Sequence, residues 1–312
     1  MNRLTTACLA TLAIAIASPS IAAAKTPSAA AAPASAPTRF SVEVVGAGPD
    51  VILIPGLSTP RDVWRPAAEA LKANHRVHLV QIKGFGEATG ANAQGPVLAP
   101  FVAELAGYIA DNHLTKPAVI GHSLGGLAAL MLAADRPELP GRVMVVDAFP
   151  FIGTLFDPAA TVESMAPRAE QMRSFMLASA EARKGQAPRD CSKLTGEAPA
   201  IPGVMSNTVR GNCIIANWGL ASDAAVSAQA LVDDLSTDMR PRLGSITAPL
   251  TIAYAQDDRV IGAGAAARLY GSAYAGAKNL KLEPIVGSFH FTMLDQPLAM
   301  LVAINKFLED GK

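Results

Sequence analysis

The chain has 312 residues, half of them hydrophobic, which is enough for one large domain or one domain with a sizeable insertion. Its 26 Lys and Arg residues balance 26 Asp and Glu residues, and no basic run occurs anywhere. The charge therefore gives no reason to expect nucleic acid or an anionic membrane surface as a partner.

The first residues have the pattern of a secretory signal. Arg3 is followed by an apolar stretch over residues 4–17, and residues 22–24 offer an A-x-A cleavage site. We expect a signal peptide over residues 1–24 and a flexible leader rich in Ala and Pro over residues 25–39; an uncleaved anchor helix is the alternative. Since no second long apolar run follows, we expect a periplasmic or secreted protein without stable membrane insertion.

Residues 40–150 alternate short apolar runs with helix-forming segments. We expect strands in "FSVEVV", at residues 51–54, 77–82 and 118–120, and in "RVMVVD", and helices near residues 63–73, 99–112 and 127–134. Unbroken apolar strands that alternate with helices predict a mostly parallel sheet with helices on both faces, an α/β fold.

The alternation stops over residues 151–240, which have a helix-like pattern and a stretch rich in Pro and Gly. It resumes over residues 241–312, where we expect two further strands in "APLTIAYAQDD" and "LKLEPIVGSFH". We therefore expect an α/β core of two parts with a helical cap inserted between them. Apolar cap residues either form a lid wall over a ligand or pack the cap helices together; they are Met165, Met172, Phe175, Met176 and Met205.

Three cysteines occur, and Cys8 lies in the expected signal. The remaining pair, Cys191 and Cys213, suggests a disulfide in an oxidising compartment, with two unrelated buried thiols as the alternative. No Cys/His cluster has the spacing of a zinc site, so we expect no metal.

The segment "KPAVIGHSLGGLAALMLAADRPE" sets Ser123 on a corner between a short apolar strand and a run of helix formers. Gly121 and Gly125 flank it in a G-x-S-x-G pattern, which in this context predicts a nucleophile elbow. The alternative is a glycine-rich turn needed only for close packing of helix and strand.

A serine nucleophile needs a base, and His290 is the best placed of the five histidines. It follows the last expected strand, where parallel sheets gather their ligands, and it comes after the serine and the candidate acids. His122 adjoins Ser123 and leaves the corner in another direction, so it is a poor base. The other three histidines fit surface roles; they are His75, His78 and His113.

The acid that would orient the histidine has three candidates. Asp257 and Asp258 follow one expected strand, and Asp147 ends "RVMVVD" as a more distant competitor. The developing oxyanion would be bound by the backbone N–H groups of Leu124, next to the nucleophile, and of Leu57, after "VILIPG".

Five motifs together resemble the α/β-hydrolase superfamily with a helical cap, in element order over Phe40 to Lys312: "ILIPGLSTPRDVW", "QIKGFGEA", "GHSLGG", "YAQDDRV" and "GSFHFTMLDQP". The resemblance implies Ser123 as nucleophile, Asp258 as acid and His290 as base. The chain departs from the family pattern at Pro55, Gln81, Lys83 and Ala255. Gln81 and Lys83 occupy polar positions of that pattern, where a change alters the contacts around the elbow. A serine nucleophile argues against relatives that use aspartate, the haloalkane dehalogenases and epoxide hydrolases.

The sequence thus predicts an exported serine hydrolase, without a cofactor, that cleaves a carboxylic ester of a small-molecule substrate through an acyl-enzyme. The same three residues also suit an acyltransferase, or a hydrolase of amides, lactones or carbon–carbon bonds. A non-catalytic binding member of the fold is a further alternative, although such a protein has no need of all three residues.

Overall fold

A computed structural model describes residues 36–310. The expected signal peptide and most of the expected leader lie outside these residues. No helix within residues 36–310 is both long enough and apolar enough to cross a membrane.

The core is a seven-stranded sheet with the strand order β1-β3-β2-β4-β5-β6-β7. Only β1 runs antiparallel to its neighbour β3. The mostly parallel sheet that the sequence predicts is therefore confirmed. The strands are β1 Phe40–Val45, β2 Asp50–Ile54, β3 Arg76–Ile82, β4 Ala118–His122, β5 Arg142–Val146, β6 Leu250–Gln256 and β7 Leu280–Val286.

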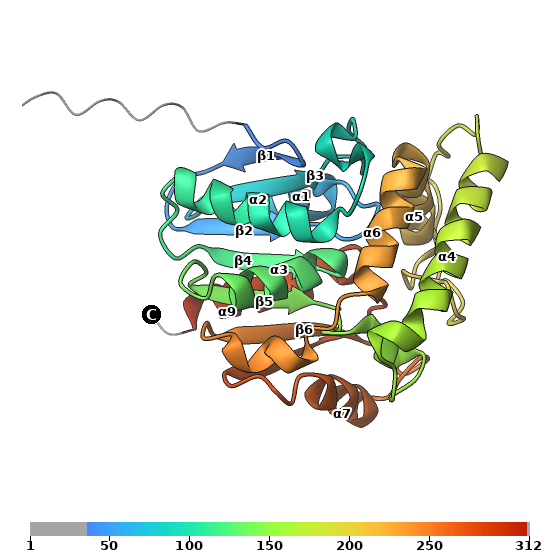
Figure 1. Ribbon diagram of the computed structural model, residues 1–312. Helices are drawn as coiled ribbons and strands as arrows, with labels where there is room; N and C mark the ends of the chain where they lie inside the picture. The colour runs from blue at the N-terminus through green and yellow to red at the C-terminus, as the bar shows by residue number, and fades with distance from the viewer. Residues whose placement is uncertain (1–35, 311–312) are drawn as a thin grey trace, which may run out of the picture. The chain divides into compact units, whose positions relative to one another are not determined.

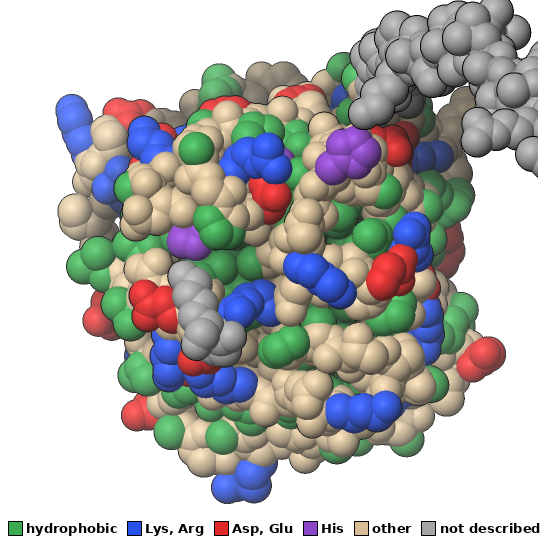
Figure 2. All heavy atoms as spheres, turned by 90° about the vertical axis from the view of Figure 1, so that its left-hand side faces the viewer, with side chains coloured by type: hydrophobic (Ala, Val, Ile, Leu, Met, Phe, Trp, Pro, Cys, Tyr) green, Lys and Arg blue, Asp and Glu red, His purple; other side chains and the backbone are tan. Residues whose placement is uncertain are grey.

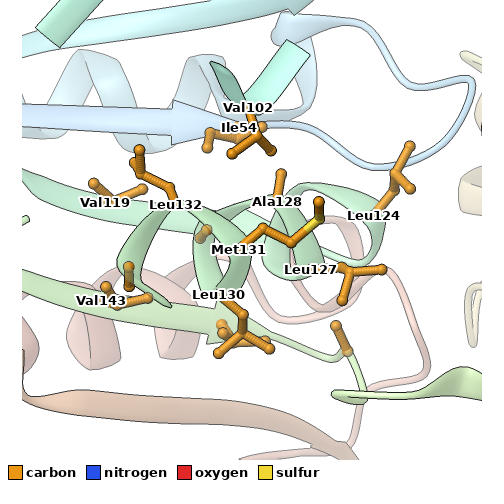
Figure 3. Packing of buried hydrophobic residues seen from close by; sticks show 14 of the residues in the cluster. Ile54, Val102, Val119, Leu124, Leu127, Ala128, Leu130, Met131, Leu132 and Val143 are labelled. Carbon is orange, nitrogen blue, oxygen red and sulfur yellow. The ribbon is translucent and has the colours of Figure 1, made fainter. Parts of the chain in front are cut away.

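Side chains of successive strand residues pack on opposite faces, as the pleat requires. In β2, Ile52 and Ile54 belong to the apolar cluster under α2, α3 and α7, whereas Val51 and Leu53 belong to the cluster under α1 and α9. Figure 3 shows α3 side chains packed against β2, β4 and β5. The helices of the core are α1 Arg65–Leu71, α2 Leu98–Asp111, α3 Leu124–Asp135, α7 Ala263–Ala273, α8 Thr292–Asp295 and α9 Pro297–Glu309.

The chain between β5 and β6, residues 147–249, forms a group of helices of its own, here named the β5–β6 segment. Figure 1 shows these helices gathered beyond the carboxyl ends of the parallel strands, at the right of the view. They are α4 Val162–Ala182, α5 Val209–Ala221 and α6 Ala224–Leu235. Short 3₁₀ turns complete the chain at Arg61–Trp64, Gly90–Ala93, Ile152–Leu155 and Arg240–Ser245.

A disulfide joins Cys191, in the long loop after α4, to Cys213 on α5, with 5.8 Å between the two Cα atoms. The expected pairing of these cysteines is present in the structure. The covalent link holds the loop, which has little regular structure, against a helix of the same segment.

The face at the amino ends of the parallel strands, opposite the β5–β6 segment, carries charge of both signs (Figure 1, Figure 2). Figure 2 shows Lys and Arg side chains interspersed with Asp and Glu and with apolar side chains on this face. The part of this face that is visible in Figure 2 lacks the single-sign patch that attracts a polyanion.

Candidate active site

Ser123 lies on a strained corner between β4 and α3. Its backbone has φ 53° and ψ −122°, a conformation that L-residues rarely adopt. Glycine is needed on both sides: a Cβ on Gly121 would lie 2.0 Å from the Gly125 carbonyl oxygen, and one on Gly125 would lie 2.5 Å from that of Ile54. The geometry is that of the elbow which the sequence pattern predicts.

His290 and Asp147 meet at the carboxyl edge of the sheet, where Nδ1 of the ring lies 2.7 Å from Oδ2 of the carboxylate. Since a carboxylate only accepts, Nδ1 carries the proton and Nε2 is left to accept one. Strand register places Asp147 near the serine, because His122 pairs with Val146 in the ladder between β4 and β5. Ser123, Asp147 and His290 all line one cavity.

The prediction that Asp258 orients His290 is wrong. Val146 pairs with Ala253, so β6 continues beyond the end of β5, and Asp258 lies further out, with an exposed side chain. Asp257 does not take the role either, because Arg259 donates to both of its carboxylate oxygens, at 2.9 and 2.8 Å. The carboxylate that meets the histidine is Asp147.

Asp147 is held by three donors. Besides His290, the N–H of Ala255 and the hydroxyl of Tyr270 donate to its Oδ1, at 2.8 and 2.6 Å. Burial by itself would raise the pKa of Asp147, but the hydrogen bond and charge of His290, with these two donors, hold it below its ordinary value. Asp147 therefore stays ionised, as a group that orients and stabilises an imidazolium must.

Tyr270 was not foreseen from the sequence as part of the site. Burial first, and the Asp147 charge second, raise the pKa of its hydroxyl well above the ordinary value. The hydroxyl therefore remains a donor to the carboxylate. In the sequence it is an unremarkable residue of the apolar face of α7, and only its contact with Asp147 distinguishes it.

His122 holds the backbone of His290. Its Nε2 donates to the carbonyl oxygen of His290 at 3.0 Å, and the two rings lie 4.6 Å apart between centroids. Burial, with the nearby His290 as the next cause, lowers the pKa of His122 to about 3. The ring is thus neutral and bonded to the His290 backbone, while its expected unsuitability as the base stays a prediction.

The loop after β2 runs directly beside the serine. A Cβ on Gly56 would lie 3.1 Å from the Cβ of Ser123 and 2.9 Å from Nδ1 of His122, so only glycine allows this approach. The next residue is Leu57. On the other side of the serine, Leu124 is the first residue of α3, where backbone N–H groups have no intrahelical partner.

Asp295 ties the histidine loop to the β5–β6 segment. Its carboxylate accepts from the N–H groups of Phe289 and Asn207, at 2.8 and 3.0 Å, and from the hydroxyl of Ser206. The N–H of Phe291 donates in turn to the carbonyl of Met205. This acid, in "FTMLDQP", was not expected to be a positioning residue.

The cavity at these residues has a volume of about 570 Å³ and mostly apolar walls. Apolar side chains of both the core and the β5–β6 segment line it: Ile152, Leu155, Ile201, Val260, Leu269 and Phe289. Of the proposed lid residues Met165, Met172, Phe175, Met176 and Met205, none lines it; Met165, Met172 and Met176 belong instead to the apolar cluster within the segment. Within the described residues, no group of three or more His, Cys, Asp or Glu is placed to hold a metal ion.

Comparisons with known proteins bear on the family and the fold. Residues 51–304 match the profile of the alpha/beta hydrolase family. A pimeloyl-acyl-carrier-protein methyl ester esterase of Aeromonas salmonicida is 36% identical over 110 residues, which are 35% of this chain and 42% of that protein. The chain spans about two fifths of the length of the curated relatives that it matches.

Solved structures match over most of the chain. An enol-lactonase of Burkholderia xenovorans is 19% identical with a TM-score of 0.64, over 87% of this chain and 96% of that one. A thermophilic esterase of Thermogutta terrifontis is 19% identical with a TM-score of 0.65, over 86% and 92%. At this identity the likeness concerns the fold.

Proposed function

Because the chain belongs to the alpha/beta hydrolase family, we propose that it is a serine hydrolase which cleaves a carboxylic ester through an acyl-enzyme. The observation that carries this proposal is the 2.7 Å contact between His290 and Asp147 at the wall of a cavity that Ser123 also lines. The esterase activity in the name of the Aeromonas relative supports the same class of reaction.

In the proposed mechanism, Nε2 of His290 takes the hydroxyl proton of Ser123 while the oxygen attacks the ester carbonyl. The imidazolium that forms is stabilised by Asp147, and it returns the proton to the leaving alcohol. Water then attacks the acyl-enzyme with His290 again as base, which releases the acid and restores the serine.

The oxyanion of both tetrahedral intermediates would be bound by the N–H groups of Leu57 and Leu124. The close approach of the Gly56 backbone to Ser123 and the unpaired position of Leu124 at the start of α3 support this assignment. One such donor typically contributes about 3 kcal/mol of transition-state stabilisation.

The nucleophile is tested with p-nitrophenyl esters of short to medium acyl chains. Ser123→Ala should lower kcat by about 10³-fold or more, because the remaining groups cannot form the acyl-enzyme. A phosphonate directed at active-site serines should label the wild type and leave the variant unlabelled. Turnover that does not depend on Ser123, together with failed labelling, would refute the proposed function.

The acid is tested by a matched pair of substitutions that each remove one carboxylate. Asp147→Asn should lower kcat by roughly 10³- to 10⁴-fold, because the amide cannot stabilise an imidazolium and favours the wrong tautomer. Asp258→Asn should stay within about twofold of the wild type, since this side chain is exposed and away from the histidine. The opposite pattern would restore the acid implied by the family resemblance.

Export and a cap are part of the same proposal. The Cys191–Cys213 disulfide supports an oxidising compartment, and the position of the β5–β6 segment beyond the strand ends supports a cap. Mass spectrometry of the exported fraction should find a chain that starts at Lys25. A full-length chain confined to the cytoplasm would contradict export.

A further inference from the structure

Asp234 is a buried acid that the proposed mechanism does not use. It lies near the end of α6 and lines the same cavity as Ser123 and His290, and only 9% of the residue is exposed. Its neighbour Asp233 points elsewhere and has a structural role, because its Oδ2 accepts from the N–H groups of Val97 and Leu98 at 2.6 and 2.9 Å. Two adjacent acids thus face different surroundings.

The Asp234 carboxylate has no hydrogen-bond donor among residues 36–310. Every other acid buried in the site has donors: Asp147 has three, and Asp257 is bound by Arg259. A buried polar group without a partner costs free energy, and such groups are rare in folded proteins. Burial raises the pKa of Asp234 to about 7, where the charge of His290 lowers it and that of Asp233 raises it.

The basic side chains at the cavity already have partners. Arg259 also lines the cavity, but its guanidinium binds Asp257 and, through Nη1 at 2.9 Å, Glu197. Nδ1 of His290 is bound to Asp147. Neither group is therefore free to donate to Asp234, and its donor is supplied by what fills the cavity, water or a bound molecule.

The surrounding walls restrict what that molecule is. Apart from the groups just named, the wall is formed mainly by aliphatic and aromatic side chains, which favour an apolar ligand body. We infer that Asp234 is a specificity residue which binds a hydrogen-bond donor, a hydroxyl or an ammonium group, carried by an otherwise apolar ester substrate. This inference rests on the proposed function, because it names the substrate class of the same site.

The test compares esters that differ only in the donor. One series is p-nitrophenyl hexanoate with its 2-, 3- and 6-hydroxy and 6-amino derivatives; the other is hexyl acetate with its 6-hydroxy and 6-amino derivatives. At pH 8, kcat/KM of the wild type should be at least tenfold higher for one donor-bearing ester than for its plain counterpart, because an unpaired buried acid disfavours the plain one.

Three variants separate recognition from other effects. Asp234→Leu should reduce the donor preference to within twofold and raise kcat/KM for the plain ester at least threefold. Asp234→Asn should retain a preference for a hydroxyl, because its amide oxygen can accept that hydrogen bond. Its preference for an ammonium group should weaken, because a neutral amide no longer attracts the positive charge. The control Glu170→Gln, which removes an exposed charge from α4, should leave the preference unchanged.

Two results would overturn the inference. One is that Asp234→Leu prefers donor-bearing esters as strongly as the wild type does, or that neither protein prefers them. The other is a loss of kcat by the same factor for all esters in Asp234→Asn, which would mean that the acid acts on His290 and not on the substrate.

A binding readout keeps this test separate from the proposed function. Heptan-2-one, 7-hydroxyheptan-2-one and 7-aminoheptan-2-one are titrated by calorimetry onto the full chain carrying Ser123→Ala. At least one donor-bearing ketone should bind tenfold tighter than the plain ketone, and adding Asp234→Leu should abolish this difference. If the wild type hydrolyses no ester, the proposed function fails, while equal affinities of the three ketones would reject the role of Asp234.

Discussion

At the residue scale, the cavity holds two buried carboxylates in contrasting environments. Asp147 accepts three hydrogen bonds and has a lowered pKa, whereas Asp234 accepts none from the described residues and has a pKa raised to about 7 by burial. Burial disfavours the charged form of both acids. The opposite directions of their pKa shifts therefore come from the donors, which Asp147 has and Asp234 lacks among the described residues. The first carboxylate is therefore fixed in its ionised form, and the second changes its charge near neutral pH.

The raised pKa of Asp234 predicts a specific pH dependence of stability. Between about pH 4 and pH 7 the unfolded chain releases this proton while the folded chain retains it, so the free energy of unfolding falls as pH rises. Relative to Asp234→Asn, the wild type should lose roughly 2 to 4 kcal/mol from pH 4 to pH 8. Urea unfolding of both proteins across this range measures the difference, and parallel pH curves would contradict the raised pKa.

At the element scale, the elbow depends on backbone packing at the end of β4. The chain that enters α3 passes so close to β2 that Gly125 has the carbonyl oxygens of Ile54 and Pro55 within 2.5 Å of where a Cβ would lie. Helix and strand meet backbone to backbone at this point, and their position fixes the direction of the Ser123 hydroxyl.

Alanine substitutions at two glycines test this packing. Gly125→Ala should destabilise the protein by several kcal/mol, because fixed backbone atoms cannot move aside. Gly107→Ala lies inside α2, where the new Cβ would have no atom within 4 Å apart from its chain neighbours and the backbone of its own helix, and should instead stabilise the protein by about 0.5 to 1 kcal/mol. Thermal melts of both variants check the pair, and a tolerated alanine at 125 would show that the corner can relax.

At the scale of the whole described unit, the β5–β6 segment is joined to the core near the candidate base. Asp295 binds Ser206 and Asn207 of the segment and the backbone of the histidine loop at once. The disulfide then fixes the rest of the long loop to α5. Asp295 thus links the segment that forms part of the cavity wall to the loop that carries the candidate base, and the disulfide is a second constraint on the same segment.

Reduction of the disulfide should lower the stability of this arrangement. Opening the Cys191–Cys213 link, with a sequence separation of 22, should cost about 3 kcal/mol in the chain-entropy model. The melting temperature should fall by roughly 5 °C or more with dithiothreitol. The variant with both cysteines replaced by serine should melt at the lower temperature with or without the reductant. An unchanged wild-type melt under reducing conditions would contradict a stabilising link.

The amino-acid sequence by itself determined the seven strands, their mostly parallel sheet, the serine corner and the histidine after the last strand. These features follow from local periodicity and from glycines that a sharp corner requires. The sequence also suggested the disulfide, because only two cysteines remain outside the expected signal peptide. The expected signal peptide and most of the expected leader lie outside the described residues, so both stay predictions.

Only the tertiary structure decided which acid meets His290. Asp147 and Asp258 both follow strands that end at the same edge, so local sequence cannot separate them. Strand register extends β6 beyond β5 and leaves Asp258 exposed, while the carboxylate of Asp257 is hydrogen-bonded to Arg259. The unpartnered Asp234 was equally hidden, because whether a carboxylate has a donor depends on residues that are distant in the chain and brought together by folding.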